Sequence, residues 1–365
     1  MRLDALHRLL GALLIAACAS VGAGGAALAG TVGERHLTAV NPTAALRDAD
    51  HRDTLRVTVW YPAAADAREV SLDIGPPGSP LFKVGSAAPD AAFADATRRP
   101  VILFSHGFGG TARMMAWFEV ALARAGYVVI AVDHPGNNGL GKMTVAGAIM
   151  FWDRAGDLAV ALAAAKADPA IGPHLDLGRL GVAGFSAGGF TAIAATGGRV
   201  DLARFRAFCQ ANPTDGICAP QKEFAVTQGE AAAALASPEL APEAARAGDD
   251  HAIAGARAAF AIAPAIVEAF DPASLAKDQT PTAIILGDAD PVAPPDTNGR
   301  LAGRLIPHAR LKELPGVGHY DFLATCTAAG VAQVPVCADK VAQDPTHQAA
   351  IDFALAWFGK TLGRP

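Results

Sequence analysis

The sequence lacks the features that mark nucleic-acid-binding and membrane-spanning proteins. Its 30 lysine and arginine residues are fewer than its 35 aspartate and glutamate residues, which gives a net charge of -5, and the basic residues form no run. A nucleic-acid partner is therefore not expected. After residue 30 no apolar stretch is long enough to cross a bilayer, so we expect no stable membrane span in the mature chain. Internal repeats and low-complexity linkers are also missing, which favours a single domain over residues 30–365.

The first 29 residues are typical of a signal peptide. Arg2 and Arg8 supply positive charge, residues 9–17 are apolar, and residues 27–29 match the small-x-small pattern that precedes cleavage. A membrane anchor is one alternative, although the second half of this segment is weakly hydrophobic for a stable span. A lipid anchor on Cys18, which follows a lipobox-like triplet, is another. We expect an exported protein, periplasmic or secreted.

Few cysteines follow the predicted signal peptide. They are Cys209, Cys218, Cys326 and Cys337, and four cysteines allow three pairings. The sequence-local pairing joins Cys209 to Cys218 and Cys326 to Cys337. The alternative is a zinc site, but C-x-x-C spacings and nearby histidines are missing, so no metal is expected. Disulfides in an oxidising compartment are the preferred interpretation.

Short apolar runs alternate with stretches of helical spacing along the chain. Residues 101–105, 127–133 and 282–287 are continuous apolar runs, which are typical of strands buried on both faces. The alternation predicts βαβ units and an α/β fold with a mostly parallel central sheet flanked by helices. The other expected strands are 55–61, 179–184, 258–263 and 310–314, the expected helices are 111–125, 151–167 and 345–361, and residues 62–99 are expected to form loops with short strands.

One region interrupts this alternation. Residues 196–257 are rich in alanine, have helical spacing and contain Cys209 and Cys218. They precede the strand at 258–263 and the acidic turn after the strand at 282–287. We predict a helical insertion that forms a lid or wall over the functional site. The alternative is a solvent-exposed excursion without a part in binding.

The most informative motif is residues 184–188, which read Gly-Phe-Ser-Ala-Gly. They match G-x-S-x-G between an apolar run and a small-residue stretch that can begin a helix. This strand, turn and helix context is that of a nucleophile elbow, which presents a serine at the edge of a sheet. Ser186 is therefore the candidate nucleophile, and its flanking glycines fit a crowded, strained turn.

A serine nucleophile needs a base, and the base needs an acid that orients it. In elbow-type hydrolases the chain order is serine, acid, histidine. Asp290 follows the expected strand at 282–287, and His319 ends a glycine-rich loop after the strand at 310–314. We predict Asp290 as the acid and His319 as the base, with Asp288 as the alternative acid.

The second requirement is an oxyanion hole made of backbone N–H groups. Residues 106–110 read His-Gly-Phe-Gly-Gly directly after the strand at 101–105 and match the glycine-rich loops that supply such a donor. We predict the amides of Phe108 and Ala187 as the donors. His106 precedes the nucleophile in the chain, so a role in shaping the loop is expected. His134 is predicted to be a turn residue that could also contact the site.

The ordered motifs HGFGG, DHPGN, GFSAGG, GDADP and GHYDF resemble those of the α/β-hydrolase superfamily. Within it, residues 55–360 are similar to the exported bacterial hydrolases grouped with dienelactone hydrolases and platelet-activating-factor acetylhydrolases. The resemblance implies a triad of Ser186, Asp290 and His319, hydrolysis of a carboxylic ester, and cysteines like those of the exported group. Dienelactone hydrolases proper use a cysteine nucleophile, so the serine favours a serine esterase.

The sequence thus predicts an enzyme that cleaves small-molecule carboxylic esters, of short-chain or acetyl type, without a cofactor. The same triad could instead serve an amidase or peptidase. A third possibility is a non-catalytic exported binding protein on a hydrolase scaffold, which would be expected to show a broken triad or oxyanion loop.

Overall fold

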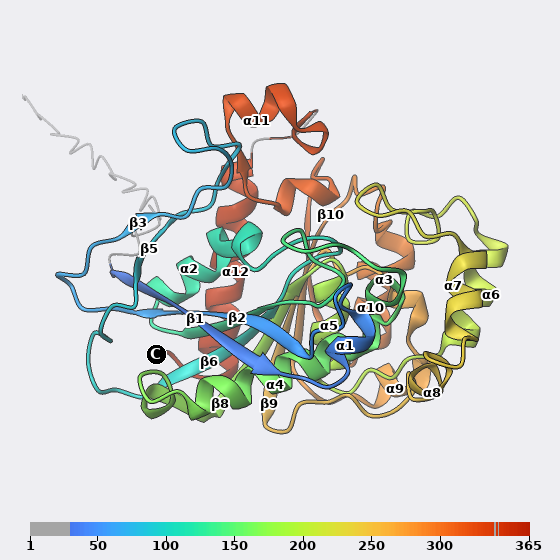
Figure 1. Cartoon of the computed structure of the whole chain (residues 1–365), viewed down its shortest axis with the longest axis horizontal. Helices are drawn as coiled ribbons and strands as arrows, with labels where there is room; N and C mark the ends of the chain where they lie inside the picture. Colours follow the sequence, from blue (N-terminus) through green and yellow to red (C-terminus); the bar gives the residue numbers. More distant parts are fainter. Residues whose placement is uncertain (1–29, 339–340, 342) are drawn as a thin grey trace, which may run out of the picture.

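The computed structural model describes residues 30–338, 341 and 343–365. The predicted signal peptide and Cys18 lie outside these described residues. In the described part of the chain, a ten-stranded sheet forms the centre of the molecule and helices cover both of its faces (Figure 1). A separate two-stranded sheet pairs β12 with β4.

The large sheet has the strand order β11-β10-β9-β8-β6-β7-β2-β1-β5-β3. Every neighbouring pair from β11 to β7 is parallel, whereas β2 pairs antiparallel with both β7 and β1. The predicted mostly parallel sheet is therefore confirmed. The strands are β1 Val32–Val40, β2 Thr54–Pro62, β3 Val70–Ser71, β4 Phe82–Lys83, β5 Ser86–Pro89, β6 Arg99–Ser105, β7 Val128–Asp133, β8 Leu175–Phe185, β9 Ala256–Ile262, β10 Thr282–Gly287, β11 Arg310–Leu314 and β12 Thr325–Cys326.

The buried strands carry apolar side chains on both faces, because helices pack on both sides of the sheet. In β6, Ile102 and Phe104 join the core beneath α2 and α12, whereas Val101 and Leu103 join the core beneath α4. The α-helices are α1 Ala44–Arg47, α2 Ala116–Arg124, α3 Val145–Ile149, α4 Arg154–Ala167, α5 Ala187–Ala194, α6 Leu202–Ala211, α7 Gln228–Leu235, α8 Ala241–Ala245, α9 Pro272–Lys277, α10 Gly299–Leu305, α11 Ala328–Gln333 and α12 Gln343–Thr361.

Several elements differ from the sequence prediction. Strand β1 was not predicted, because Gly33, Glu34, Arg35 and His36 interrupt any apolar run near its start. The helix expected over residues 151–167 begins as a 3-10 turn, Phe151–Asp153, and becomes α4 only at Arg154. The helix expected from residue 111 begins as a 3-10 turn, Arg113–Met115, and becomes α2 only at Ala116. The Thr111 hydroxyl accepts a hydrogen bond from the Met114 amide (3.0 Å), which favours the tighter turn.

Residues 196–257 contain helices α6, α7 and α8, which lie together at the end of the molecule opposite β3 and β5 (Figure 1). We call residues 196–255 the insertion, because β9 begins at Ala256. Helix α7 begins with a capping box in which Thr227 and Glu230 bond each other's backbone amides. The region is helical, as predicted.

The described residues contain two disulfides, and they confirm the sequence-local pairing. Cys209–Cys218 lies in the insertion, with its Cα atoms 5.2 Å apart, and Cys326–Cys337 lies near β12, with its Cα atoms 5.9 Å apart. Disulfides persist in oxidising compartments, so both bonds favour an exported protein. None of the described helices is at once long and apolar enough to cross a bilayer.

Candidate active site

The G-x-S-x-G motif forms a sharp turn between β8 and α5. Ser186 occupies the turn with φ 57° and ψ -118°, a conformation that non-glycine residues rarely adopt. The turn packs tightly against the end of β6: a Cβ at Gly188 would lie 1.8 Å from the Ser105 carbonyl oxygen. Glycine is therefore required there, and the crowded turn holds the Ser186 side chain at the carboxyl edge of the sheet.

An unbroken hydrogen-bond relay links the three residues predicted as a triad. The Ser186 hydroxyl donates to His319 Nε2 (2.8 Å), and His319 Nδ1 donates to Asp290 Oδ2 (2.6 Å). All three side chains are buried. Asp290 Oδ1 accepts from the amides of Val292 (2.9 Å) and Ala293 (2.8 Å), so both carboxylate oxygens are fixed.

The other candidate acid, Asp288, lies apart from the imidazole. Its side chain is exposed, and Oδ1 accepts from the Gly316 amide (2.7 Å). That bond ties the turn after β10 to the loop after β11. The two segments approach so closely that a Cβ at Gly287 would lie 1.9 Å from the Val317 carbonyl oxygen. Asp288 therefore supports the loop that carries His319, while Asp290 contacts the ring itself.

The predicted oxyanion donors lie on either side of the serine. Ala187 is the first residue of α5, where backbone amides have no partner within the helix. Phe108 lies in the glycine-rich loop after β6. In the described part of the chain, the amides of Phe108 and Ala187 donate to no protein acceptor. Both residues line a cavity together with Ser186, so their N–H groups are free for an oxygen bound there.

Two buried histidines shape the glycine-rich loop from behind. His106 Nδ1 donates to the Gly107 carbonyl oxygen (2.6 Å), and its Nε2 accepts from the His134 amide (3.1 Å). Burial is the main reason that the pKa of His106 lies well below its usual range. Burial, with Arg154 next in importance, lowers the pKa of His134 to about 3. Both rings are therefore neutral near pH 7. Both side chains are buried, and His106 lines a cavity beside His319.

Beneath these histidines lies a charged network that the sequence did not predict. Asp157 accepts from His134 Nδ1 (2.8 Å), from both terminal nitrogens of Arg47 (2.7 and 2.8 Å) and from Asn41 Nδ2 (2.7 Å). Burial alone would raise the pKa of Asp157, but the Arg47 guanidinium holds it well below its usual range. Arg154 donates to the His106 carbonyl oxygen and to the Ser105 hydroxyl. We call Arg47, His106, His134, Arg154 and Asp157 the buried network.

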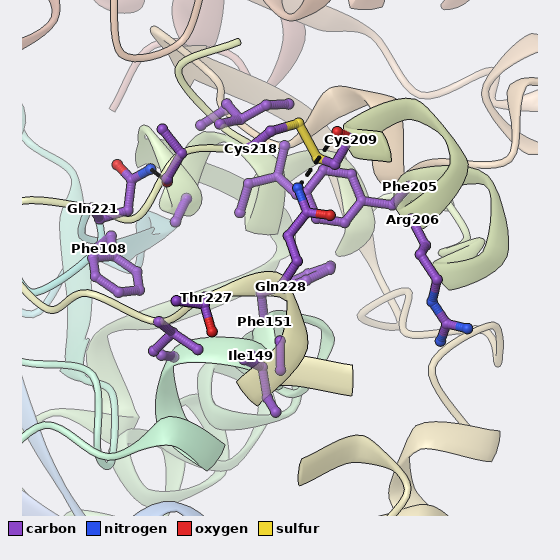
Figure 2. Close-up of a pocket in the computed structure, with 18 of the residues that line it drawn as sticks. Phe108, Ile149, Phe151, Phe205, Arg206, Cys209, Cys218, Gln221, Thr227 and Gln228 are labelled. Atoms are coloured by element: carbon purple, nitrogen blue, oxygen red, sulfur yellow. Dashed lines mark hydrogen bonds between the residues drawn. A yellow bond between two sulfur atoms is a disulfide. The ribbon is translucent and has the colours of Figure 1, made fainter. Parts of the chain in front are cut away.

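Two cavities open on Ser186. The insertion cavity, of about 200 Å³, lies between the serine and helices α6 and α7, and Figure 2 shows Phe108, Ile149, Phe151 and Phe205 around it. The second cavity, of about 250 Å³, lies on the side of His319. Among the described residues, neither lining includes His134. In the described part of the chain, no three potential metal ligands gather at one place.

Comparisons with known proteins agree with this fold. Residues 101–334 match the model of the alpha/beta hydrolase family. A solved ferulic acid esterase from Streptomyces cinnamoneus superposes with a TM-score of 0.60 at 18% sequence identity, over 92% of this chain and 91% of that one. At this identity the likeness shows the fold alone. No curated protein sequence matches the chain.

Proposed function

Because the chain belongs to the α/β-hydrolase family, we propose that it is a serine esterase that forms an acyl-enzyme at Ser186. The observation that carries the proposal is the buried relay from Ser186 through His319 to Asp290, with distances of 2.8 and 2.6 Å. Such a relay is what a serine needs to act as a nucleophile at neutral pH. The name of the solved neighbour, a ferulic acid esterase, supports an ester as the substrate.

The proposed reaction has two acyl-transfer steps. In the first, the Ser186 Oγ–carbon bond forms while the hydroxyl proton moves to His319 Nε2. The amides of Phe108 and Ala187 stabilise the negative oxygen of the tetrahedral intermediate. The proton then passes to the leaving alkoxy oxygen as the ester C–O bond breaks.

A water molecule then attacks the acyl-enzyme, with His319 accepting its proton. The same proton returns to Ser186 Oγ as the acid product leaves, so the enzyme is restored. Asp290 keeps the imidazole in the tautomer whose Nε2 is free to accept, and its charge stabilises the imidazolium. The buried network holds the loop that carries the Phe108 amide. Apart from the ester and the attacking water, every group in this scheme belongs to the chain.

An amidase or peptidase on the same relay is the second candidate. Its test is a pair of matched ester and amide substrates with the same acyl group, and activity on the ester alone favours the esterase. A non-catalytic binding protein would be expected to have a broken relay or blocked amides. The intact relay and the free amides of Phe108 and Ala187 support an enzyme instead.

We also propose that the enzyme acts outside the cytoplasm, with residues 1–29 as its signal peptide and residues 30–365 as one hydrolase domain. The two disulfides support this location. Likeness to the exported dienelactone hydrolase-like and acetylhydrolase-like enzymes remains a prediction. So does the preference for short acyl groups, and the apolar cavity of about 200 Å³ beside Ser186 favours a larger acyl group.

The proposal is tested by Ser186→Ala with p-nitrophenyl acetate as the substrate. We expect kcat to fall on the order of 10⁴- to 10⁶-fold, because the nucleophile is removed and only the oxyanion donors and binding remain. Ser79→Ala, at an exposed serine without a side-chain hydrogen bond, is the matched control and keeps wild-type activity. Full turnover by a folded Ser186→Ala protein would show that the reaction does not use this residue.

A further inference from the structure

The insertion cavity and the second cavity both reach the nucleophile. Their linings share Phe108, Ser186, Gln221 and Val292. The remaining lining residues differ: the first cavity is bounded by α6 and α7, and the second by the glycine-rich loop, Tyr320, Val334 and Val336. An ester bound at Ser186 therefore has two directions in which its two halves can extend.

The position of His319 distinguishes the two directions. His319 lines the second cavity and does not line the insertion cavity among the described residues. In the proposed mechanism the leaving oxygen must receive its proton from His319 Nε2. The alcohol half therefore lies in the second cavity. The acyl half is bonded to the same carbonyl carbon and is left with the other cavity, the insertion cavity, which Ala187 lines.

We propose that the insertion cavity is the acyl-binding site and that the enzyme prefers esters of apolar acids with a medium-length aliphatic or aromatic acyl group. This assignment rests on the proposed serine esterase function and adds the substrate class. An acetyl group would fill little of a cavity of about 200 Å³. Each further methylene buried in an apolar site improves binding by about fourfold, so a longer acyl chain gains with length until the cavity is full.

The chemistry of the lining supports an uncharged acyl group. Arg206 is the only charged side chain among the described lining residues, and Figure 2 shows its guanidinium directed away from the other side chains drawn. Four aromatic rings contribute, and aliphatic side chains complete the wall. Besides alanines, the apolar lining residues are Phe108, Ile149, Phe151, Leu202, Phe205, Ile217, Phe224, Val226, Leu235, Ile266 and Val292.

A disulfide forms part of the wall of the insertion cavity. Cys209 on α6 and Cys218 in the following loop both line the cavity, and Figure 2 shows the bond between them. Gln228 of α7 donates to the Cys209 carbonyl oxygen (3.5 Å), which connects the two helices. The shape of the acyl site therefore depends on the insertion, while the reacting groups lie on the sheet.

The test places a bulky side chain on α7 so that it fills part of the insertion cavity. Ala231 is half-buried and lines the cavity, whereas Ala233 on the same helix is exposed and does not. The substrates are p-nitrophenyl acetate and p-nitrophenyl octanoate, which share a leaving group. For the wild type we expect a higher kcat/KM with octanoate. We expect Ala231→Trp to lower the octanoate-to-acetate ratio of kcat/KM by at least about tenfold, and its circular dichroism spectrum reports whether it folds. Ala233→Trp should keep the wild-type ratio.

A second substrate series varies the alcohol and keeps the acyl group constant. Ethyl and octyl acetate vary only the alcohol, so Ala231→Trp should leave their ratio unchanged, and Val336→Trp in the second cavity should lower the value for octyl acetate. If Ala231→Trp instead impairs octyl acetate, or if it changes neither ratio, the acyl assignment is wrong while the esterase proposal stands. If Ala231→Trp does not fold, Phe205→Ala is used in its place. We expect Phe205→Ala to enlarge the insertion cavity and to shift the preferred acyl chain of p-nitrophenyl esters to lengths beyond octanoyl. An unchanged acyl-chain preference in Phe205→Ala would also refute the assignment. A wild type that hydrolyses no ester overturns the esterase proposal and this inference with it.

Discussion

The carboxyl edge of the sheet and the insertion form opposite walls of one site, but they are held in place differently. At the edge, Ser186, Asp290 and His319 are buried and hydrogen-bonded. In the insertion, α7 and α8 have no buried residue, and α6 has only Cys209. The reacting groups thus lie on a rigid frame, and the wall that selects substrate can vary without disturbing them.

The insertion is held to the frame by apolar packing and by polar contacts near its loops. Its buried residues Val200, Leu240 and Ala247 belong to the same apolar cluster as Phe190 and Phe270. Tyr320, next to His319, donates to the Glu223 carboxylate (2.8 Å), and Thr297 donates to Asp215 (2.9 Å). These polar contacts and the Cys209–Cys218 bond add to the apolar packing. Substitutions at the edge should therefore change the reaction rate and global stability, and substitutions in the insertion should change selectivity.

The largest expected effect concerns the acid at the edge. We expect Asp290→Asn to lower kcat about 10⁴-fold, because an amide NH₂ group facing His319 Nδ1 favours the wrong tautomer and stabilises no imidazolium. Asp288→Asn, two residues away, removes charge from a group that contacts only the loop backbone, so we expect less than about a tenfold loss. Kinetics with p-nitrophenyl acetate measure both. Equal losses in the two variants would contradict the assignment of Asp290.

The next effect concerns stability beneath the edge. Asp157→Asn leaves the buried Arg47 guanidinium with Asp153, at 3.7 Å, as its remaining charge partner, so we expect the free energy of unfolding to fall by about 3 kcal/mol. The control is Asp90→Asn, which removes a largely exposed partner of Arg35 and should cost under about 1 kcal/mol. Urea unfolding measures both. A small change for Asp157→Asn would mean that the network does not stabilise the frame.

A third comparison uses the two disulfides. Replacing Cys209 and Cys218 by serine should lower the free energy of unfolding by about 2–3 kcal/mol, and replacing Cys326 and Cys337 should cost a similar amount, since the loops are of similar length. Only the first pair lines the insertion cavity. We therefore expect only the first double variant to change the ratio of octanoate to acetate hydrolysis. If the Cys326 and Cys337 double variant also changed the acyl selectivity, the claim that the insertion alone determines this selectivity would be wrong.

The smallest expected effect is a pH dependence. The unfolded chain protonates His134 below its ordinary pKa of about 6.5, whereas burial, followed by the Arg154 charge, lowers its pKa to about 3 in the fold. The unfolded state therefore binds more protons in this range, and stability falls as the pH falls. This one residue should contribute a loss of about 2 kcal/mol between pH 7 and pH 5.

Urea unfolding at pH 7 and pH 5 tests that dependence. His134→Gln should show a loss smaller than the wild type by about 2 kcal/mol, whatever its stability at pH 7. His308→Gln, at an exposed histidine, should keep the wild-type loss. An identical loss in His134→Gln would mean that the buried ring takes up a proton in the folded state.

The sequence predicted the edge of the sheet better than what lies around it. Ser186, Asp290 and His319 each follow a recognisable strand, and parallel strands bring their carboxyl ends to one edge. The elbow is a local motif whose glycines are required by contacts with neighbouring backbone. The positions of these residues, and the disulfide pairing, could therefore be predicted from short stretches of chain.

The buried network and the cavities could not be predicted in the same way. Asp157 pairs with Arg47, which lies 110 residues earlier, so nothing local reveals the contact. The one local signal was that Arg154 and Asp157, three residues apart, lie on the same face of α4 as the buried Leu158 and Ala161. The cavity depends on how α6 and α7 pack over the serine, and their alanine-rich sequences carry little information about it.

The central claim is that Ser186 is an activated nucleophile, and covalent labelling tests it most directly. An alkyl fluorophosphonate reacts with activated serines, and peptide mass spectrometry locates the adduct. We expect one adduct per chain, on Ser186, and none on Ser186→Ala or when the probe is added to unfolded protein. An unlabelled wild-type protein, or an adduct at another residue that persists in Ser186→Ala, would contradict the account.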